Sequence, residues 1–321
     1  MKLIIQIPCL NEENSLPVTL RDLPKQIDGI DCIETLIIDD GSTDKTVEVA
    51  RRHGVHHILQ LTRNKGLAKA FISGINHALK LGADIIVNTD ADNQYFGGDI
   101  PNLIRPILNG KADIVIGNRQ VETIKHFSPL KIFLQKFGSW VVRQVSGTDV
   151  PDATSGFRAY SREAALQLNV VSDFTYTLET LISAGKKNLA IHHVPVRTNA
   201  KLRESRLFSS IWIYIKRSII TMIKIYSMYK PLKVFTIVGG TSFFLGTTIG
   251  CRYLYYFFIH QTAGHIQSLI LAAIFLIVGF QIIMMGIVAE LIAINRQLLE
   301  DIQIRIRRGE LEKTDRENIA N

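Results

Sequence analysis

Apolar runs of strand length alternate with helical patterns over the first 207 residues of the chain. The predicted strands are rich in aliphatic residues and comprise Lys2–Pro8, Ile33–Asp40, Val55–Leu61, Asp84–Asp90 and Asp113–Asn118. Between them, apolar residues recur at helical spacing, for example over Thr43–His53 and Leu67–Leu81. This alternation predicts an α/β fold with a mostly parallel sheet and helices on both of its faces.

Residues 208–294 are far more apolar than the part before them. Ile266–Ala289 is an uncharged run of about two dozen residues, long enough to cross a bilayer as a helix. Val234–Cys251 is a second run, which Arg252 interrupts before three tyrosines suited to a membrane interface. Because only a short segment joins the two runs, they predict a transmembrane hairpin. The alternative is two buried helices of a soluble protein.

An amphipathic pattern precedes this hairpin. Apolar residues recur at helical spacing at Phe208, Ile211, Trp212, Ile215, Ile219, Met222, Ile223 and Tyr226. Lys216, Arg217 and Lys224 fall away from that stripe, which is typical of a helix resting in the membrane interface. The alternative is a core-facing helix of the α/β domain. The sequence therefore predicts six parts: an α/β domain (1–207), an interface segment (208–230), a first span (231–260), a loop (261–265), a second span (266–294) and a charged tail (295–321).

Basic residues flank the hairpin at its outer ends and are absent from its connecting loop. They are Lys230 and Lys233 before it, and Arg296, Arg305, Arg307 and Arg308 after it. The positive-inside rule therefore places both ends of the hairpin, and with them the α/β domain, in the cytoplasm. Arg252 in the first span is expected either to snorkel to the far interface or to contact another part of the bundle.

Composition and charge narrow the classes of protein. Hydrophobic residues make up 47% and charged residues 21% of the 321 residues, which excludes a disordered or fibrous protein. The net charge of +8 is concentrated beside the apolar segments, which favours an anionic membrane surface over nucleic acid as a partner. The three cysteines, Cys9, Cys32 and Cys251, are widely spaced and odd in number, so a reduced environment is expected. The N-terminal apolar run ends at Pro8 and is not typical of a signal peptide.

The strongest chemical signal is the sequence Asp90-Ala-Asp92-Asn-Gln94, which directly follows a predicted strand. Alternate carboxylates place hard oxygen ligands at one edge of the sheet, where ligands of such folds bind. These ligands suit Mg²⁺ or Mn²⁺, which in turn can hold a diphosphate. The alternative is a solvated turn with aspartate caps.

Two further polar motifs follow strands. In Asp39-Asp-Gly-Ser-Thr-Asp44, Asp39 or Asp40 could reach the base or ribose of a nucleotide, or the motif could only cap the next helix. In Pro8-Cys-Leu-Asn-Glu12, Asn11 or Glu12 could do the same. No glycine-rich dinucleotide fingerprint or Walker motif is found, which argues against a dinucleotide enzyme or an NTPase.

Together these motifs resemble those of family 2 glycosyltransferases with the GT-A fold. The matching stretches, in order, are Ile7-Pro-Cys-Leu-Asn-Glu-Glu13, Ile38-Asp-Asp-Gly-Ser-Thr-Asp44, Asn88-Thr-Asp-Ala-Asp-Asn-Gln94 and Ser155-Gly-Phe-Arg158. With the two-span hairpin, the chain is similar to polyisoprenyl-phosphate glycosyltransferases such as dolichyl-phosphate mannose synthases and bacterial polyprenyl-phosphate glucosyltransferases. The chain departs from the family's usual pattern at Leu10, Arg203 and Arg206, where Tyr, Gly and Lys are usual.

The resemblance implies roles for individual residues. Nucleotide contacts are expected from Pro8, Asn11, Glu12, Asp39, Asp40 and Asp90. Asp92 and Gln94, with Asp90, would hold the metal, and Asp152 would face the sugar or act as a base. Acceptor phosphate contacts are expected from Arg119, Arg158, Arg203 and Arg206, of which Arg119 would be catalytic together with Asp90 and Asp152.

The expected function is a metal-dependent, inverting transfer of a hexose from a UDP- or GDP-sugar to undecaprenyl or dolichyl phosphate. The transfer would occur at the cytoplasmic face of the membrane, with Mg²⁺ or Mn²⁺ as the cofactor. One alternative is a processive polysaccharide synthase of the same fold, but the sequence lacks the Gln-x-x-Arg-Trp motif of those enzymes. Another is a non-catalytic membrane scaffold with a decayed transferase domain. The expected partners are the donor, the lipid acceptor and membrane lipids, and a homo-oligomer is left open.

Overall fold

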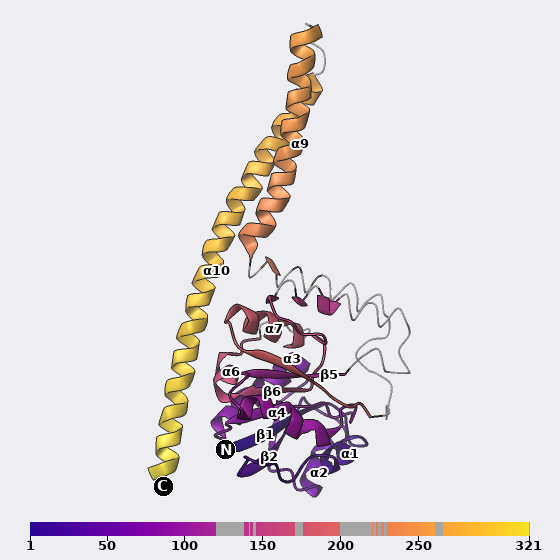
Figure 1. Ribbon diagram of the computed structural model, residues 1–321, viewed down its shortest axis with the longest axis vertical. Coiled ribbons are helices and arrows are strands. Elements are labelled where there is room, and N and C mark those ends of the chain that lie inside the picture. Colours follow the sequence, from indigo (N-terminus) through magenta and orange to yellow (C-terminus); the bar gives the residue numbers. More distant parts are fainter. Residues whose placement is uncertain are drawn as a thin grey trace. The chain divides into compact units, whose positions relative to one another are not determined.

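The computed structural model describes residues 1–119, 138–140, 142–143, 146–170, 176–199, 220, 223, 226–227, 230–260 and 266–320. The chain divides into two compact units (Figure 1). The α/β unit comprises residues 1–218 together with 304–321, and the hairpin unit comprises residues 219–303.

A seven-stranded sheet with the order β3-β2-β1-β4-β6-β5-β7 forms the centre of the α/β unit. Its strands are β1 (Lys2–Cys9), β2 (Cys32–Asp39), β3 (His57–Gln60), β4 (Ile85–Asn88), β5 (Ile114–Asn118), β6 (Arg158–Ser161) and β7 (Ile191–Pro195). β6 runs antiparallel to both of its neighbours, whereas all other pairs are parallel. The predicted α/β fold with a mostly parallel sheet is confirmed, and the five predicted strands correspond to β1–β5.

Helices cover both faces of the sheet (Figure 1). They are α1 (Leu16–Arg21), α2 (Thr46–Arg52), α3 (Leu67–Lys80), the short 3₁₀ helix η1 (Gly97–Asp99), α4 (Ile100–Leu108), α6 (Arg162–Gln167) and α7 (Tyr176–Lys186). Strand β1 is buried on both sides, as its largely apolar sequence predicts. Leu3, Ile5 and Ile7 belong to a core that includes buried side chains of α1, α2 and α4. On the other face α3 lies so close that a Cβ added at Gly74 would stand 2.7 Å from Ile38.

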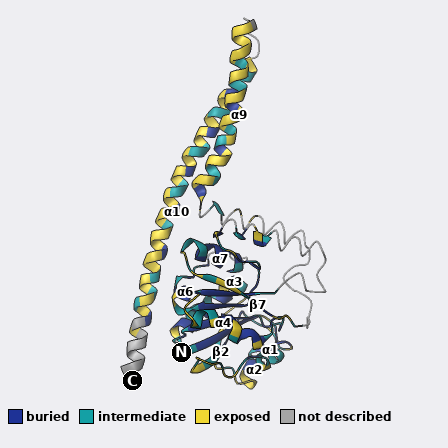
Figure 2. Cartoon of the chain, in the orientation of Figure 1, coloured by how far each residue is buried: buried dark blue, intermediate teal, exposed yellow. Residues whose placement is uncertain are grey.

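The hairpin unit consists of α9 (Pro231–His260) and the first part of α10 (Ile266–Ala320). Both helices are long and apolar enough to cross a membrane, and few of their side chains are buried within the protein (Figure 2). α10 continues unbroken to Ala320, so the charged tail predicted to begin at residue 295 is an extension of the second apolar helix. The predicted loop 261–265 lies outside the described residues, as does most of the predicted interface segment 208–230.

Small residues allow the backbones of α9 and α10 to approach closely. A Cβ added at Gly239 would stand 2.7 Å from the carbonyl oxygen of Gly279, and one at Gly279 would meet the Gly239 carbonyl at the same distance. Ser242 donates a hydrogen bond to the Phe275 carbonyl at 3.0 Å. Close packing of small residues and interhelical hydrogen bonds are what hold apolar helices together in the absence of a hydrophobic driving force.

Arg252, which interrupts the apolar run of the first helix, lies over an aromatic ring. Its guanidinium carbon is 5.8 Å from the centre of the Tyr256 ring, one turn further along α9. A cation over an aromatic face is partly compensated for its loss of water. The Arg252 side chain therefore contacts a tyrosine of its own helix.

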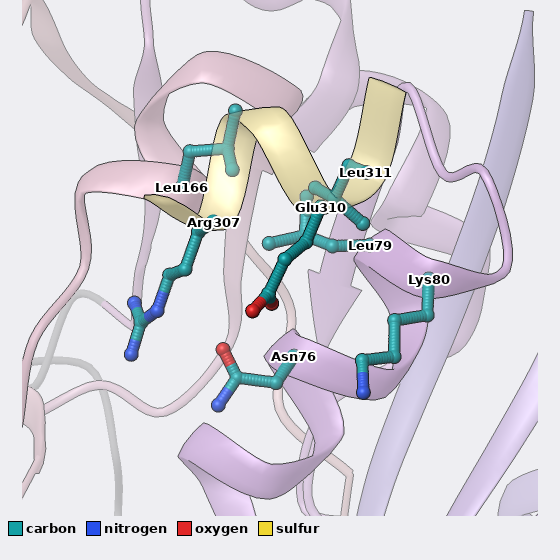
Figure 3. Close-up of a pocket in the computed structure, with 7 residues that line it drawn as sticks. All are labelled: Asn76, Leu79, Lys80, Leu166, Arg307, Glu310 and Leu311. Carbon is teal, nitrogen blue, oxygen red and sulfur yellow. The ribbon is translucent and has the colours of Figure 1, made fainter. Parts of the chain in front are cut away.

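The last part of α10 packs within the α/β unit (Figure 3). Arg307 donates from Nη1 to the Leu168 carbonyl at 3.1 Å, and Arg308 forms an ion pair with Glu163. Leu311 is only 8% exposed. A pocket of about 220 Å³ is lined there by Asn76, Leu79, Lys80, Leu166, Arg307, Glu310 and Leu311.

Candidate active site

The loops after β1 and β2 interlock at the carboxyl ends of these parallel strands. Asn11 has a left-handed backbone, with φ of 55°. Its N–H donates to Ser42 Oγ at 2.9 Å, and its side-chain oxygen accepts from the Thr43 N–H at 2.7 Å. The N–H of Glu12 donates to Thr46 Oγ1 at 2.8 Å. The predicted nucleotide motifs are therefore brought together in space and braced against one another.

The two aspartates at the end of β2 are buried and accept hydrogen bonds from the backbone. Asp39 accepts from the Ser42 N–H at 3.0 Å, which closes the turn after the strand. Asp40, 4% exposed, accepts from the N–H groups of Lys65 and Gly66 at 2.7 and 2.9 Å. These bonds brace the turn after β2, and Asp40 fixes the loop that enters α3.

The backbone at Gly41 depends on the absence of a side chain. Its φ is 77°, and a Cβ there would stand 2.7 Å from the Asn64 nitrogen and the Arg63 carbonyl carbon. Since both are backbone atoms, a larger residue would push the two loops apart. The strand-to-helix turn after β2 therefore needs glycine.

The loop after β4 presents alternate side chains on one accessible side. Asp90, Asp92 and Gln94 are partly exposed, while Ala91 and Asn93 between them are buried. The N–H of Gln94 donates to Asp92 Oδ1 at 3.1 Å, and Asn93 adopts a left-handed φ of 55°. The loop thus places three oxygen-bearing side chains beside one another at the ligand-binding edge of the sheet.

The donors on this loop fit a divalent metal that shares its coordination with a substrate. Within the described residues, no three or more His, Cys, Asp or Glu side chains gather where they could hold a metal ion by themselves. Mg²⁺ in enzymes is commonly held by one or two carboxylates together with substrate phosphates. Asp90 and Asp92 with the amide oxygen of Gln94 match that chemistry.

Asp90 lies against the loop that contains the Ser155-Gly-Phe-Arg158 motif. A Cβ added at Gly156 would stand 3.2 Å from both carboxylate oxygens of Asp90 and 2.9 Å from the Tyr176 hydroxyl. The Gly156 N–H donates to the Tyr95 hydroxyl at 3.0 Å. Glycine in this motif is therefore explained by the close approach of the Tyr176 hydroxyl and the Asp90 carboxylate.

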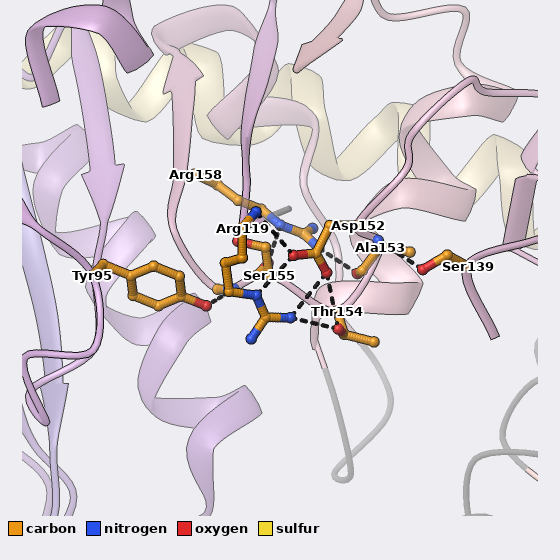
Figure 4. A network of polar contacts seen from close by, with 9 residues as sticks. Tyr95, Arg119, Ser139, Asp152, Ala153, Thr154, Ser155 and Arg158 are labelled. Carbon is orange, nitrogen blue, oxygen red and sulfur yellow. Dashed lines mark hydrogen bonds and ion pairs between the residues drawn. The ribbon is translucent and has the colours of Figure 1, made fainter. Parts of the chain in front are cut away.

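Arg119 and Asp152 form a two-point ion pair at the site (Figure 4). Nε and Nη2 of Arg119 lie 2.7 and 2.9 Å from the two carboxylate oxygens of Asp152. Nη2 also donates to Thr154 Oγ1 at 2.8 Å, and that hydroxyl donates to Asp152 at 3.0 Å. The Arg119 guanidinium carbon is 6.0 Å from the centre of the Tyr95 ring, which places the pair beside the Asp90–Gln94 loop.

The environment of Asp152 disfavours the predicted role of a base. Burial by itself would raise the pKa of this 2% exposed carboxyl, but the charge and hydrogen bonds of Arg119 and the bond from Thr154 outweigh it, so the pKa of Asp152 lies below its ordinary value. A carboxylate with a lowered pKa and both oxygens bound to one guanidinium is a weak proton acceptor. Its geometry suits holding Arg119 in place.

Arg158 is placed where it cannot meet a lipid phosphate, which corrects the prediction made for it. Its side chain is fully buried. Nε donates to the Ser155 carbonyl at 2.7 Å, Nη2 to the Ala153 carbonyl at 2.8 Å, and Nη1 to the Thr177 carbonyl at 2.9 Å and Thr180 Oγ1 at 2.8 Å. Arg158 therefore ties the loop before β6 to α7. Arg203 and Arg206, the other arginines predicted to bind phosphate, lie outside the described residues.

Sequence reasoning missed a buried amide network behind the site. Gln6 donates to the Asn88 side-chain oxygen at 2.9 Å, and Asn88 donates to the Gly156 carbonyl at 2.9 Å and to the Tyr176 hydroxyl at 3.0 Å. Both amides are completely buried. The available signal was a polar residue within or at the end of an otherwise apolar strand, Gln6 in β1 and Asn88 at the end of β4, because buried polar side chains are usually held by hydrogen bonds.

The chain resembles known glycosyltransferases over most of the α/β unit. The family model for glycosyl transferase family 2 matches residues 4–168. An uncharacterized protein of Methanocaldococcus jannaschii is 34% identical over 206 residues, covering 61% of this chain and 81% of that protein. The UDP-N-acetylglucosamine–dolichyl-phosphate N-acetylglucosaminyltransferase of Methanococcus voltae is 32% identical over 217 residues, which cover 60% of this chain and 83% of that enzyme. The undecaprenyl-phosphate mannosyltransferase of Micrococcus luteus is 28% identical over 222 residues, covering 66% and 89%.

Solved structures support the fold. Glucosyl-3-phosphoglycerate synthase from Mycobacterium tuberculosis, solved with Mn²⁺, UDP and phosphoglyceric acid, superimposes with a TM-score of 0.56. The two chains are 19% identical, and the alignment covers 70% of this chain and 78% of that one. At this identity the likeness is evidence for the fold alone. Since the matching family model spans more than half of the sequence, the chain belongs to glycosyl transferase family 2.

Proposed function

We propose that the enzyme transfers a hexose from a UDP- or GDP-sugar to a polyisoprenyl phosphate, such as undecaprenyl or dolichyl phosphate, with inversion at the anomeric carbon. Two of its relatives are named for sugar transfer to dolichyl phosphate and to undecaprenyl phosphate, respectively. Two helices able to span a membrane follow the α/β unit, which suits an acceptor whose tail stays in the bilayer.

The observation that carries this proposal is the approach of the Asp90–Gln94 loop to the Arg119–Asp152 pair, since the Arg119 guanidinium carbon lies 6.0 Å from the centre of the Tyr95 ring, which directly follows the loop. In our assignment Asp92 and Gln94, with Asp90, hold Mg²⁺ or Mn²⁺ against the donor diphosphate. When bound, the metal supplies positive charge that stabilises the departing nucleoside diphosphate. Asp90 also faces the donor, close to the loop around Gly156.

The reaction needs two anions to meet in line. An oxygen of the acceptor phosphate attacks the anomeric carbon, the bond from this carbon to the donor phosphate oxygen breaks, and the nucleoside diphosphate leaves with the bonding electrons. The acceptor phosphate is already ionised near neutral pH, because its second pKa is about 6. A strong base is then unnecessary, which agrees with the lowered pKa of Asp152.

Arg119 is our candidate for the contact with the acceptor phosphate. Its Nε and Nη2 are engaged by Asp152 and Thr154, and among the described residues none accepts a hydrogen bond from Nη1. An arginine fixed in this way presents its remaining donor in a defined direction and screens the repulsion between the two anions. Arg203 and Arg206 remain further candidates from the sequence, since they directly precede the predicted interface segment.

The nucleotide site is assigned to the interlocked loops after β1 and β2, with Pro8, Asn11, Glu12, Asp39 and Asp40. Leu10 at the tip of the first loop is 36% exposed. An aliphatic side chain there cannot stack on a base as an aromatic ring would.

The basic residues outside the hairpin assign the α/β unit and the end of α10 to the cytoplasm. Donor nucleotides would then reach the site from the cytoplasm, while the lipid would reach it from the adjacent leaflet.

The test is a panel of radiolabelled UDP- and GDP-sugars with polyprenyl phosphate, in Mg²⁺ or Mn²⁺, using the purified full chain in detergent. We expect one donor to yield a lipid product that extracts into organic solvent. Asp92→Asn should lower the rate by at least a hundredfold, since a metal-held charge at a leaving group is worth several kcal/mol. Near wild-type turnover by Asp92→Asn, or indifference to a chelator, would rule out the metal role.

A further inference from the structure

The loop that carries Asp90, Asp92 and Gln94 is held by contacts from distant parts of the chain. Thr19 Oγ1, on α1, donates to the Ala91 carbonyl at 2.9 Å. From the other side, the Asn199 N–H donates to the Gln94 carbonyl at 2.9 Å, and Asn199 Nδ2 donates to the Asn93 carbonyl at 3.1 Å. One residue therefore binds two consecutive carbonyls of the loop.

The two bonds from Asn199 hold the peptide groups on either side of the Gln94 α-carbon, and these groups determine the direction of the Gln94 side chain. Asn93, between Asp92 and Gln94, has a left-handed φ of 55°, a conformation that costs free energy for a residue other than glycine. Such a backbone persists only where neighbouring groups hold it. The side chains on either side, Asp92 and Gln94, are the partly exposed ones assigned to the metal.

Asn199 is itself fixed by the short segment that precedes it. Thr198 forms a β-bridge with Tyr95, and the Phe96 N–H donates to the Arg197 carbonyl at 3.3 Å. Arg197 binds Asp99 through its N–H at 2.7 Å and through Nη2 at 2.6 Å. The pairing of this backbone with residues 95–96 therefore fixes the position of Asn199 and orients its side-chain amide toward the loop.

The same segment also reaches the strand end that carries Arg119. The Val196 N–H donates to the Asn118 carbonyl at 3.0 Å, one residue before Arg119. Residues 196–199 thus connect the Asn118 end of β5 with the Asn93–Gln94 peptide. Residues 196–199 therefore link the backbone next to Arg119, which is assigned to the acceptor phosphate, with the loop of Asp92 and Gln94, which are assigned to the metal.

We propose that Asn199 is a positioning residue for the divalent metal, which acts by clamping the Asn93 and Gln94 carbonyls so that Asp92 and Gln94 present their oxygens together. This inference rests on the metal role in the proposed function. Residues that orient metal ligands without touching the ion typically change metal affinity by 10- to 100-fold when they are substituted. Asn199 would act in that way on the Asp90–Gln94 loop.

The test is direct binding of Mn²⁺ to the full chain in detergent, followed by electron paramagnetic resonance, with UDP and separately with GDP. The variants are Asn199→Ala, the matched control Thr198→Ala, and Asp92→Asn. Thr198 is exposed and pairs through its backbone, so its side chain can be removed without loss of the bridge. If Asn199→Ala does not fold, Asn199→Leu also removes the side-chain donor and, like alanine, keeps the backbone bond to the Gln94 carbonyl.

We expect Asn199→Ala to weaken Mn²⁺ binding at least tenfold, while Thr198→Ala stays within twofold of the wild type. The Mn²⁺ concentration for half-maximal turnover should rise by the same factor, with kcat at saturating Mn²⁺ and the KM for polyprenyl phosphate little changed. Unchanged Mn²⁺ affinity in Asn199→Ala, an equal loss in Thr198→Ala, or an effect confined to the acceptor KM would overturn the proposal. If the wild type bound no Mn²⁺ with either nucleotide, or if Asp92→Asn bound it normally, the proposed metal function itself would be wrong and this inference would fall with it.

Discussion

Arg119 and Asp152 are joined by a two-point ion pair, with Nε and Nη2 of the guanidinium 2.7 and 2.9 Å from the carboxylate oxygens. Asp152 is 2% exposed, and its partner comes from the end of β5, 33 residues earlier in the chain. Arg119 lies near Tyr95, which follows the Asp90–Gln94 loop, and Asp152 directly precedes the residues whose carbonyls Arg158 binds. Loss of this ion pair should therefore destabilise the loop that contains Asp152 and change the direction of the Arg119 side chain.

This pair predicts a specific dependence of stability on pH. The pKa of Asp152 is lowered in the folded chain, so the pair stabilises the fold fully above the unfolded value of about 3.9 and loses this contribution as the pH falls through the folded pKa. We expect Asp152→Asn to have a lower thermal unfolding midpoint than the wild type in detergent. The difference should be constant from pH 7 to 5 and shrink below about pH 4. A difference that persists unchanged to pH 3 would contradict the assigned state of Asp152.

Arg158 is predicted to act on folding and not on acceptor binding. Arg158→Met keeps much of the volume but leaves the carbonyls of Ala153, Ser155 and Thr177 without their donor. Each buried polar group left unpaired costs about 1–3 kcal/mol, so the yield of folded protein should fall sharply. The control is Arg105→Ala, at an exposed position on α4, which should be neutral. A well-folded Arg158→Met whose only defect is a raised KM for polyprenyl phosphate would restore the original assignment.

The close contact between Gly239 and Gly279 of the two apolar helices can be tested by comparing substitutions at the adjacent residues Gly239 and Gly240. Gly239→Ala brings a methyl group within 2.7 Å of the Gly279 carbonyl oxygen, whereas the structure has nothing within 4 Å of a Cβ at Gly240. Overpacking at a close contact costs about 1–3 kcal/mol. We expect Gly239→Ala to lower the thermal aggregation midpoint of the full chain in detergent. Gly240→Ala should be neutral or slightly stabilising, because alanine is the better helix former. Equal midpoints for the two variants would argue against this packing.

The proposed topology can be tested with cysteines. Gly264, in the connecting loop outside the described residues, should become accessible from outside the cell when it is changed to cysteine in a Cys251→Ser background. The native Cys32 is exposed on the α/β unit and serves as an internal control, while Cys9 is buried. An impermeant thiol reagent applied to intact cells should label Gly264→Cys but not Cys32, as read from the labelled peptides by mass spectrometry. Labelling of Cys32 in intact cells would invert the topology.

The strands were predictable where the sequence of each strand shows an apolar run bounded by turn residues. β1–β5 are apolar runs that end in turn residues, and each was placed from the sequence. β6 and β7 were not. β6 has four residues and begins at Arg158, a charged residue that sequence patterns assign to the surface but that here is buried among carbonyl groups. An antiparallel strand inserted between β4 and β5 depends on tertiary hydrogen bonds, which periodicity does not contain.

The candidate site was predictable as a set of motifs but not as a set of roles. The alternation of Asp90, Asp92 and Gln94 was enough to expect three oxygen ligands on one side of a loop. The partner of Asp152 could not be inferred, because Arg119 is far from it in sequence and the ion pair exists only once β5 is in the sheet. Asn199 was missed for a similar reason, since it meets Gln94 only through a bridge between segments about a hundred residues apart.

The central claim, sugar transfer onto an intact lipid phosphate, is tested most directly by identifying both products of one turnover. The purified full chain is incubated with the active sugar nucleotide, Mn²⁺ and polyprenyl phosphate. The lipid product is then analysed by mass spectrometry and the released nucleotide by chromatography. The account predicts a lipid that carries one hexose and one phosphorus, a nucleoside diphosphate in equal amount, and no product from the corresponding polyprenol. A lipid with two phosphorus atoms and release of a nucleoside monophosphate, or equal transfer to polyprenol, would contradict it.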